Sequence, residues 1–217
     1  MKNKFFITAL SLGLLSAVSC GKDKPVTNEV SEVETTQDGT MYQVDTQESH
    51  IEWKGFKVFK SENTSHFGTI RFESGEITMK DGMLESGKFV ADMNSLENED
   101  LKNDAEQKAK LEGHLKSGDF FEVETYPTAT YEITKVTSGV TGDYNTMIDG
   151  NLTLKGVTQP VSFNANVTVN EGIVTIATEP KDIMREDYGV KFQVPVQNGL
   201  IKNEVNVQML IKATASQ

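Results

Sequence analysis

Apolar and polar residues alternate over most of the chain beyond residue 41, and this period of two constrains the fold more than any other feature. Segments 161–169 (VSFNANVTV) and 204–213 (EVNVQMLIKA) place every second, apolar residue on one side. Successive side chains of a β-strand point to opposite faces, so the pattern predicts strands with one buried face. Weaker alternation predicts further strands at 50–58, 66–72, 76–80, 88–94, 129–136, 151–155 and 173–179.

The alternating segments are separated by Asp-Gly, Asn-Gly, Glu-Gly and Ser-Gly pairs, which supply the positive φ that hairpins need. Segment 96–121 breaks the alternation and lacks β-branched residues, which predicts an inserted helix. Asn98 or Asp100 is the expected N-cap, and Gly118 marks the expected end. Antiparallel strands with one helix are compatible with a closed barrel or a sandwich, and alternation alone does not choose between them.

The first forty residues have a different character. Lys2 and Lys4 precede an apolar run from 5 to 18, which is shorter than the roughly 20 residues that a membrane span requires. The run is typical of an export signal, so residues 1–19 are predicted to be a signal peptide. Segment 20–40 is polar, has no aromatic residue and is predicted to be a flexible tether. Residues 41–217 are left as one folded domain.

Charge and motif content exclude several classes of protein. The formal net charge of −11 argues against a protein that binds nucleic acid or anionic lipid through a broadly basic surface. A single cysteine, Cys20, excludes an intrachain disulfide and a Cys-based zinc cluster. No nucleophile elbow, P-loop or dinucleotide fingerprint is present, and the three histidines lack metal-ligand spacing. The expectation is a non-enzymatic protein without a metal.

The small-residue run that ends at Cys20 (AVSC) resembles the lipobox of bacterial lipoproteins. The resemblance implies cleavage before Cys20, acylation of this residue and attachment of the chain to a membrane of the cell envelope. Gly21 is not the aspartate that signals inner-membrane retention in enteric lipoproteins. The outer membrane is therefore the expected location.

Two blocks of the chain are specific in their order and spacing: 114–129 (HLKSGDFFEVETYPTA) and 150–161 (GNLTLKGVTQPV). With most of the chain from residue 42, they resemble the YceI-like family of bacterial envelope proteins. The resemblance implies an all-β fold, an eight-stranded antiparallel lipocalin-like barrel with one inserted helix. It also implies that the interior holds a long-chain isoprenoid lipid, with no other cofactor, and it leaves monomer and homodimer both open.

The expected ligand site has an apolar wall and a polar mouth. The residues directed to the barrel axis by the alternation are Ile51, Trp53, Ile70, Phe72, Phe89, Met93, Tyr131, Ile133, Leu152, Leu154, Phe163 and Val207. The candidates to contact a lipid head group are Arg185, Tyr188, Lys155 and Lys191. Because cations are few in this acidic chain, a neutral head such as a quinone or a free prenol is at least as strongly favoured as a phosphate.

The expected function is therefore sequestration or carriage of a polyisoprenoid or prenylquinone-type lipid in an apolar cavity. Two alternatives remain. A protein with a filled barrel would have a structural or interaction role. An enzyme that acts on a lipid head group would use His114, Arg185 and Asp187, the one group of residues that we would test by mutation. An ion pair between Arg185 and Asp187 that closes one barrel end is an equal alternative to a head-group role.

Overall fold

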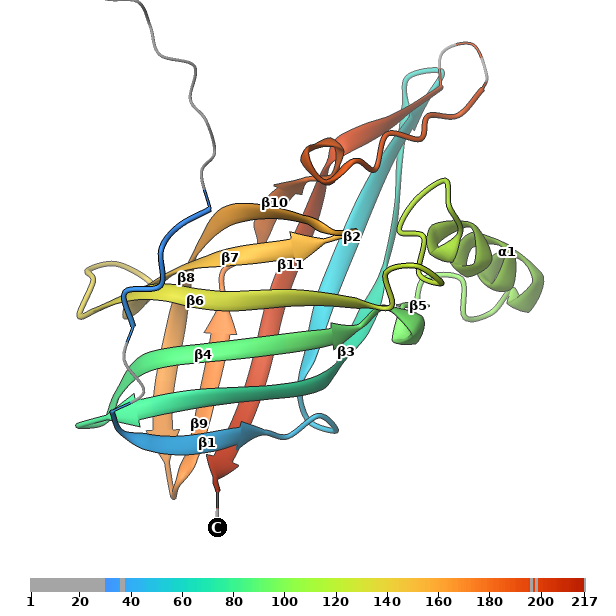
Figure 1. The fold of residues 1–217 in the computed structure, drawn as a ribbon. Coiled ribbons are helices and arrows are strands. Elements are labelled where there is room, and N and C mark those ends of the chain that lie inside the picture. The colour runs from blue at the N-terminus through green and yellow to red at the C-terminus, as the bar shows by residue number, and fades with distance from the viewer. Residues whose placement is uncertain (1–29, 36–37, 196, 198, 217) are drawn as a thin grey trace, which may run out of the picture.

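The computed structural model describes residues 30–35, 38–195, 197 and 199–216. In this part of the chain eight antiparallel strands form a closed ring (Figure 1), because the last strand in the pairing order returns to the first. The fold is thus the eight-stranded antiparallel barrel that was expected, and not a sandwich. In ring order the strands are β11 (Gly199–Ala215), β2 (His50–Phe59), β3 (Glu62–Lys80), β4 (Met83–Asp92), β6 (Thr128–Ser138), β7 (Thr146–Leu154), β8 (Val157–Asn170) and β9 (Ile173–Thr178).

Three short strands complete the sheet at the ends of the ring. β1 (Thr40–Val44) pairs with both β3 and β11 at the end that β2 does not reach. β10 (Lys181–Met184) continues beyond β9 along β11, and β5 (Glu97–Asn98) adds to the edge of β3. These additions cover strand edges that the eight long strands leave unpaired.

β3 is one strand of 19 residues where alternation predicted two short ones. The register shifts between Phe72 and Ser74 and again between Thr78 and Met79. At the first β-bulge the extra residue is Glu73 of β3, which interrupts the alternation although the strand continues. At the second the extra residue is Glu85 of β4. At about 3.3 Å per residue, β3 runs from one end of the barrel to the other.

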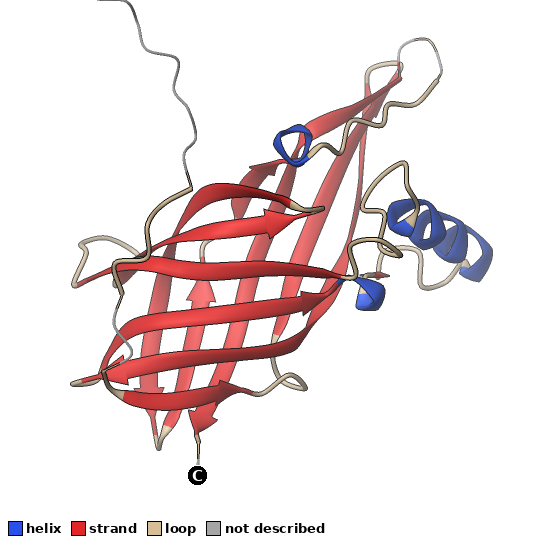
Figure 2. Ribbon diagram, in the orientation of Figure 1, coloured by secondary structure: helices blue, strands red, loops and turns tan. Residues whose placement is uncertain are grey.

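The inserted helix is shorter than predicted. α1 (Ala105–Lys116) begins after Asp104, whose side chain accepts a hydrogen bond from Gln107 N, and it ends before Ser117. The predicted caps Asn98 and Asp100 are therefore wrong, as are the predicted bounds 96–121. Figure 2 shows α1 outside the ring, at one end of the barrel.

Two short 3-10 helices, η1 (Met93–Ser95) and η2 (Arg185–Tyr188), lie at the same end of the barrel as α1. No helix in the described residues is long and apolar enough to cross a bilayer.

The half of the barrel nearest β1 is a packed core. Its inward side chains include Ile77, Ile133, Ile176 and Ile211, each no more than 2% exposed. Side chains from strands on opposite sides of the ring meet there and fill the interior. Stability is expected to depend mainly on this half, because burial of apolar side chains is the dominant favourable contribution to folding.

The N-terminal predictions concern residues that are mostly not described. The predicted signal peptide and Cys20 lie outside the described residues. Of the predicted tether, residues 30–35 lie against the barrel wall: Ser31 N donates to Asn151 Oδ1 over 3.1 Å, and Glu34 N donates to Thr134 O over 2.9 Å.

Candidate ligand-binding cavity

The half of the barrel nearest α1 contains a cavity of about 300 Å³. Every strand of the ring except β9 contributes a residue to its wall, and side chains of η1, α1 and segment 192–194 complete the mouth. The wall is mainly aliphatic and aromatic. The barrel is therefore filled at one end and hollow at the other.

Eleven of the twelve side chains predicted to face the barrel axis lie on the cavity wall. The exception is Ile133, which is 1% exposed and belongs to the packed core. It follows Tyr131 on β6 at the next inward position, so the boundary between cavity and core falls between these two residues. Alternation identifies the inward face of a strand but does not tell how far along that face the interior is filled.

Aromatic rings form the floor of the cavity. The rings of Phe72 and Phe89 lie 6.0 Å apart, and those of Tyr131 and Phe163 meet edge to face at 5.5 Å. The Tyr131 hydroxyl is 2.8 Å from Val161 O and donates to it. Burial, together with the charge of Asp149, raises the pKa of the Tyr131 phenol well above its usual range. The floor is consequently uncharged and has its polar atom hydrogen-bonded to the barrel itself.

Tyr131 fits against β7 because residue 150 has no side chain. A Cβ built on Gly150 would lie 2.4 Å from Tyr131 Cζ and 2.6 Å from its hydroxyl oxygen. The glycine of the 150–161 block thus allows close approach of the ring to the backbone. This contact fixes the position of one floor residue.

Basic side chains surround the mouth. The ionisable wall residues other than Tyr131 are Lys57, His66, His114, Arg185 and Lys202, and none of the described wall residues is Asp or Glu. In a chain with a net charge of −11, such a wall is an unusual local environment. Ammonium groups there can donate hydrogen bonds to the phosphate, carboxylate or carbonyl oxygens of a bound molecule.

Arg185 lies on the wall, but the structure itself uses its guanidinium. It is 3% exposed and donates from Nε to Lys202 O over 3.0 Å, from Nη2 to Ile201 O over 3.2 Å and from Nη1 to Val190 O. Its acidic neighbour is Glu186 at 3.7 Å, and not Asp187, the partner in the alternative ion pair. Burial lowers the pKa of Arg185, while Glu186 acts in the opposite direction. The residue ties the chain after η2 to the beginning of β11.

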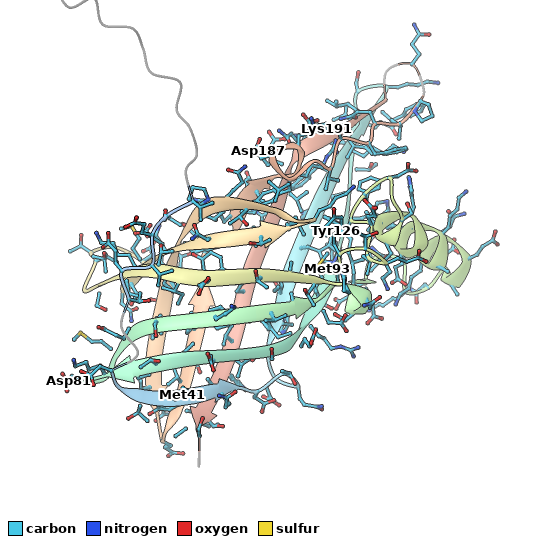
Figure 3. The ribbon with its side chains drawn as sticks, in the orientation of Figure 1. Met41, Asp81, Met93, Tyr126, Asp187 and Lys191 are labelled. Carbon is cyan, nitrogen blue, oxygen red and sulfur yellow. The ribbon has the colours of Figure 1, made fainter. Side chains whose placement is uncertain are left out.

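The other three predicted head-group residues do not lie on the cavity wall. Tyr188 is buried in the main core, and burial raises its pKa above the usual range. The Lys155 ammonium donates to Phe120 O over 2.9 Å and lies 3.6 Å from Glu122. Lys191 is exposed beyond η2 (Figure 3).

Sequence reasoning missed Lys57 and Lys202, which take wall positions instead. Lys57 has the same strand parity as Ile51 and Trp53, so the alternation of β2 contains the signal. Lys202 has no such signal, because the pairing of β11 with β2 shifts register between Ile201 and Val205. Beyond a bulge of this kind, the inward residues of a strand can no longer be identified by counting every second residue.

His114 connects α1 to the chain that follows η2. Its ring meets Phe120 edge to face at 5.0 Å and Phe192 at 4.7 Å, and its Nε2 lies 3.1 Å from Asp119 Oδ2. Asp187, the third member of the suggested enzymatic constellation, is exposed and does not line the cavity. His114 and Arg185 thus reach the cavity with partners other than Asp187.

His66 and Asp100 attach the beginning of the insertion to β3. Asp100 Oδ2 lies 2.8 Å from His66 Nδ1, its Oδ1 accepts from Phe67 N over 2.9 Å, and Asn98 Nδ2 donates to Phe67 O over 3.0 Å. Burial alone would raise the pKa of the Asp100 carboxyl, but hydrogen bonds from Phe67 N, His66 and Asn98 hold it below its ordinary value. These contacts explain why residues 98–100 are not helical.

Replacing Asp100 with Asn is expected to destabilise the protein by about 1–2 kcal/mol at pH 7, because charge-assisted hydrogen bonds are lost. The folded-state pKa lies below the unfolded value, so this contribution is present above about pH 4 and is lost as the pH falls through the folded value. Urea unfolding of both proteins at a series of pH values measures the difference. Asp104→Asn is the control, since Asn serves equally well as an N-cap. An Asp100→Asn effect of the same size at pH 7 and pH 2 would contradict the assignment.

The fold and the cavity together define a class: closed antiparallel barrels with an internal apolar cavity open at one end. The sequence profile of the YceI-like domain family matches residues 42–213. The protein therefore belongs to the YceI-like domain family.

Relatives in other bacteria match parts of this domain. A UPF0312 protein of Pseudomonas aeruginosa strain PAO1 is 49% identical over 59 residues, which cover 27% of this chain and 29% of the relative. A UPF0312 protein of Pseudomonas putida strain W619 is 32% identical over 124 residues, 54% of this chain and 60% of the relative. The matched region therefore spans less than two thirds of the length of these curated relatives.

Two solved structures share the fold. Burkholderia cenocepacia BcnA superposes with a TM-score of 0.61 at 20% identity, covering 79% of this chain and 99% of BcnA. A polyisoprenoid binding domain from Saccharophagus degradans superposes with a TM-score of 0.53 at 16% identity, covering 81% of this chain and 98% of that domain. At these identities the likeness is one of fold.

Proposed function

We propose that this protein binds lipid, and that it sequesters or carries a polyisoprenoid or prenylquinone-type lipid in its barrel cavity. The observation that carries the proposal is the hollow half of the barrel, an apolar cavity of about 300 Å³ with a neutral aromatic floor. The similar fold of a polyisoprenoid binding domain supports the same ligand class. A structural protein with a filled barrel would not contain such a cavity.

The distribution of polarity favours one orientation of the lipid. An apolar chain would point toward the floor of Phe72, Phe89 and Phe163, and a polar head would remain at the mouth near Lys57 and Lys202. Quinone carbonyls and phosphate oxygens both accept hydrogen bonds from ammonium groups. The cavity volume is at the lower end of the roughly 300–1,000 Å³ typical of small-molecule pockets, so a long lipid would place one end inside and the rest at the mouth.

Transfer from a membrane sets the energetics. A lipid chain already dissolved in a bilayer gains little by entering another apolar space, because the hydrophobic contribution counts surface removed from water. Affinity must then come from shape and from head-group contacts. Such binding suits reversible exchange with a membrane rather than permanent storage.

The proposed setting is the cell envelope, with an acylated Cys20 that holds the barrel at the outer membrane. Acyl chains contribute roughly 0.8 kcal/mol for each buried methylene, and several chains on one residue are sufficient for stable attachment. An anchor of this kind would keep the cavity within reach of membrane lipid. Mass spectrometry of the membrane-extracted protein tests the acylation, because an unmodified thiol at Cys20 would refute it.

Trp53 provides a direct test of lipid entry, because it is the one tryptophan of the chain and lies on the cavity wall. Brominated prenols, prenyl phosphates and quinone analogues are expected to quench its fluorescence saturably. Organic extraction of the purified full chain, followed by mass spectrometry, should recover a co-purified lipid. Preparations that contain no lipid and show no quenching with any of these probes would refute the proposal.

A further inference from the structure

The strands that form one side of the mouth continue past the cavity into an exposed projection. We call this projection the mouth tip and define it as residues 56–60 of β2 and its turn together with residues 199–202 of β11. Phe59 pairs with Gly199 and Val58 with Leu200 across the two strands. In Figure 1 these strand ends extend beyond η2 and α1, away from β1 and the C-terminus.

The mouth tip exposes large apolar side chains. Phe59 is 37% exposed and Leu200 is 51% exposed. Both lie beside wall residues of the cavity, because Phe56, Lys57, Ile201 and Lys202 line its mouth. By strand parity Phe59 lies on the face of Lys57 and Ile201, whereas Leu200 lies with Val58 on the other face. The tip therefore exposes apolar side chains on both of its faces, next to the mouth of the cavity.

Lysines lie close to the two aromatic rings of the tip. Lys60 Nζ lies 5.3 Å from the centre of the Phe59 ring, and the Nζ atoms of Lys54 and Lys202 lie 5.5 and 5.6 Å from the centre of the Phe56 ring. Rings flanked by ammonium groups are suited to the boundary of a bilayer, where the ring enters the acyl region and the charge stays at the head groups.

The charge of the chain is unevenly distributed around this tip. Segments 53–64 and 190–203 contain five of the 21 Lys and Arg residues but one of the 32 Asp and Glu residues. With five basic residues and one acidic residue, these two segments carry a net charge of +4 in a net negative protein. Anionic lipid attracts such a cluster with a strength of about 1 kcal/mol for each basic residue near the surface.

We propose that the mouth tip docks on an anionic lipid bilayer, with Phe59 and Leu200 inserted at the level of the head groups. Docking places the cavity mouth against the leaflet, so that a lipid can pass from the bilayer beside the tip into the barrel. The docking itself rests on the tip alone, whereas the passage of lipid rests on the function proposed above.

A tryptophan at the tip tests docking without any cavity ligand. In the full chain carrying Phe59→Trp, emission is expected to move to shorter wavelength in vesicles of phosphatidylcholine and phosphatidylglycerol, and much less in pure phosphatidylcholine. Met83→Trp is the matched control, because Met83 is exposed at the start of β4. The turn before it contains Asp81, which Figure 3 labels at the opposite end of the barrel. An unchanged Phe59→Trp emission in both kinds of vesicle would overturn the proposal.

A second experiment separates docking from lipid binding. The double variant Phe59→Ser/Leu200→Ser is expected to slow quenching of Trp53 by brominated lipid delivered from anionic vesicles about tenfold, with unchanged quenching by the same lipid in detergent micelles. Met83→Ser/Ile173→Ser is the control, since both side chains are exposed away from the tip. If neither wild type nor any variant accepts lipid from micelles while the Phe59→Trp emission still shifts with vesicles, docking is supported and the proposed carrier function is refuted.

A different outcome would overturn the docking proposal. If the Phe59→Trp emission shifts with protein concentration in the absence of vesicles, and sedimentation shows dimers, the tip is an interface between copies of this chain.

Discussion

Replacement of Ile51 by tryptophan is expected to lower lipid occupancy of the barrel at least about tenfold while the fold is retained. Ile51 lies on the cavity wall, packs against the apolar clusters at its edge and is only partly buried, so an indole there is expected to extend into the free volume of about 300 Å³. The added ring then occupies space that the lipid chain needs. A loss of about 1.4 kcal/mol in binding corresponds to the tenfold effect. Lipid extracted from equal amounts of each protein and quantified by mass spectrometry gives the measurement.

The neighbouring substitution Glu52→Trp is the matched control. Glu52 points to the outer face of β2 and is exposed, so the same ring placed there adds no volume to the cavity. Wild-type occupancy is expected for this variant. Equal occupancy in Ile51→Trp and wild type, with both proteins folded, would mean that the lipid does not use this cavity.

Replacement of Gly150 by alanine is expected to destabilise the barrel by about 3 kcal/mol, near the upper end of the usual cost of overpacking. The new Cβ would overlap the ring of Tyr131, which is 4% exposed and held through its hydroxyl by Val161 O. Either the ring leaves its position in the floor or the two strands separate. The midpoint and slope of urea unfolding give the change in free energy.

Gly113→Ala provides the contrast for this experiment. Gly113 lies inside α1 with nothing within 4 Å of the position of a Cβ. Alanine there is expected to be neutral or to stabilise the helix by about 0.5–1 kcal/mol. Combining Gly150→Ala with Tyr131→Leu should recover part of the lost stability. If Gly150→Ala alone is as stable as wild type, the close approach of Tyr131 to Gly150 is not a constraint on the fold.

The fold could be predicted because the alternation carries most of its information. Each predicted strand overlaps a strand of the ring, and the resemblance of blocks 114–129 and 150–161 to a known family selected the barrel over the sandwich. The bulges where β3 pairs with β4 and the short edge strands β1, β5 and β10 could not be predicted. A bulge interrupts the alternation of apolar and polar residues, and strands of two to five residues are too short to show an alternation.

The apolar part of the candidate site was more predictable than its polar part. Inward side chains follow from strand parity, and only the depth of the packed core was missing, as Ile133 illustrates. Cations are different, because their role depends on partners that are distant in sequence. Arg185 binds backbone carbonyls of residues 190, 201 and 202, and Lys155 binds that of Phe120. Residue type alone gave no indication of these partners.

The insertion shows a third limit of sequence reasoning. Residues 98–100 have the capping residues and charges typical of a helix start, yet their side chains bind β3. An Asn or Asp side chain satisfies the backbone of a distant strand as readily as that of its own helix. The helix therefore begins later, at the next residue that can cap it, Asp104.

The position of β11 in the ring has a consequence for how the protein is made. β11 is the last strand of the chain, and it joins β2, which is early in the sequence, to β9. A nascent chain that lacks Gly199–Ala215 leaves the edges of β2 and β9 unpaired, so the ring cannot close. Contacts so distant in sequence form slowly, because a long loop must be closed first. Completion of the cylinder therefore depends on the segment Gly199–Ala215, which is made after every other strand of the ring.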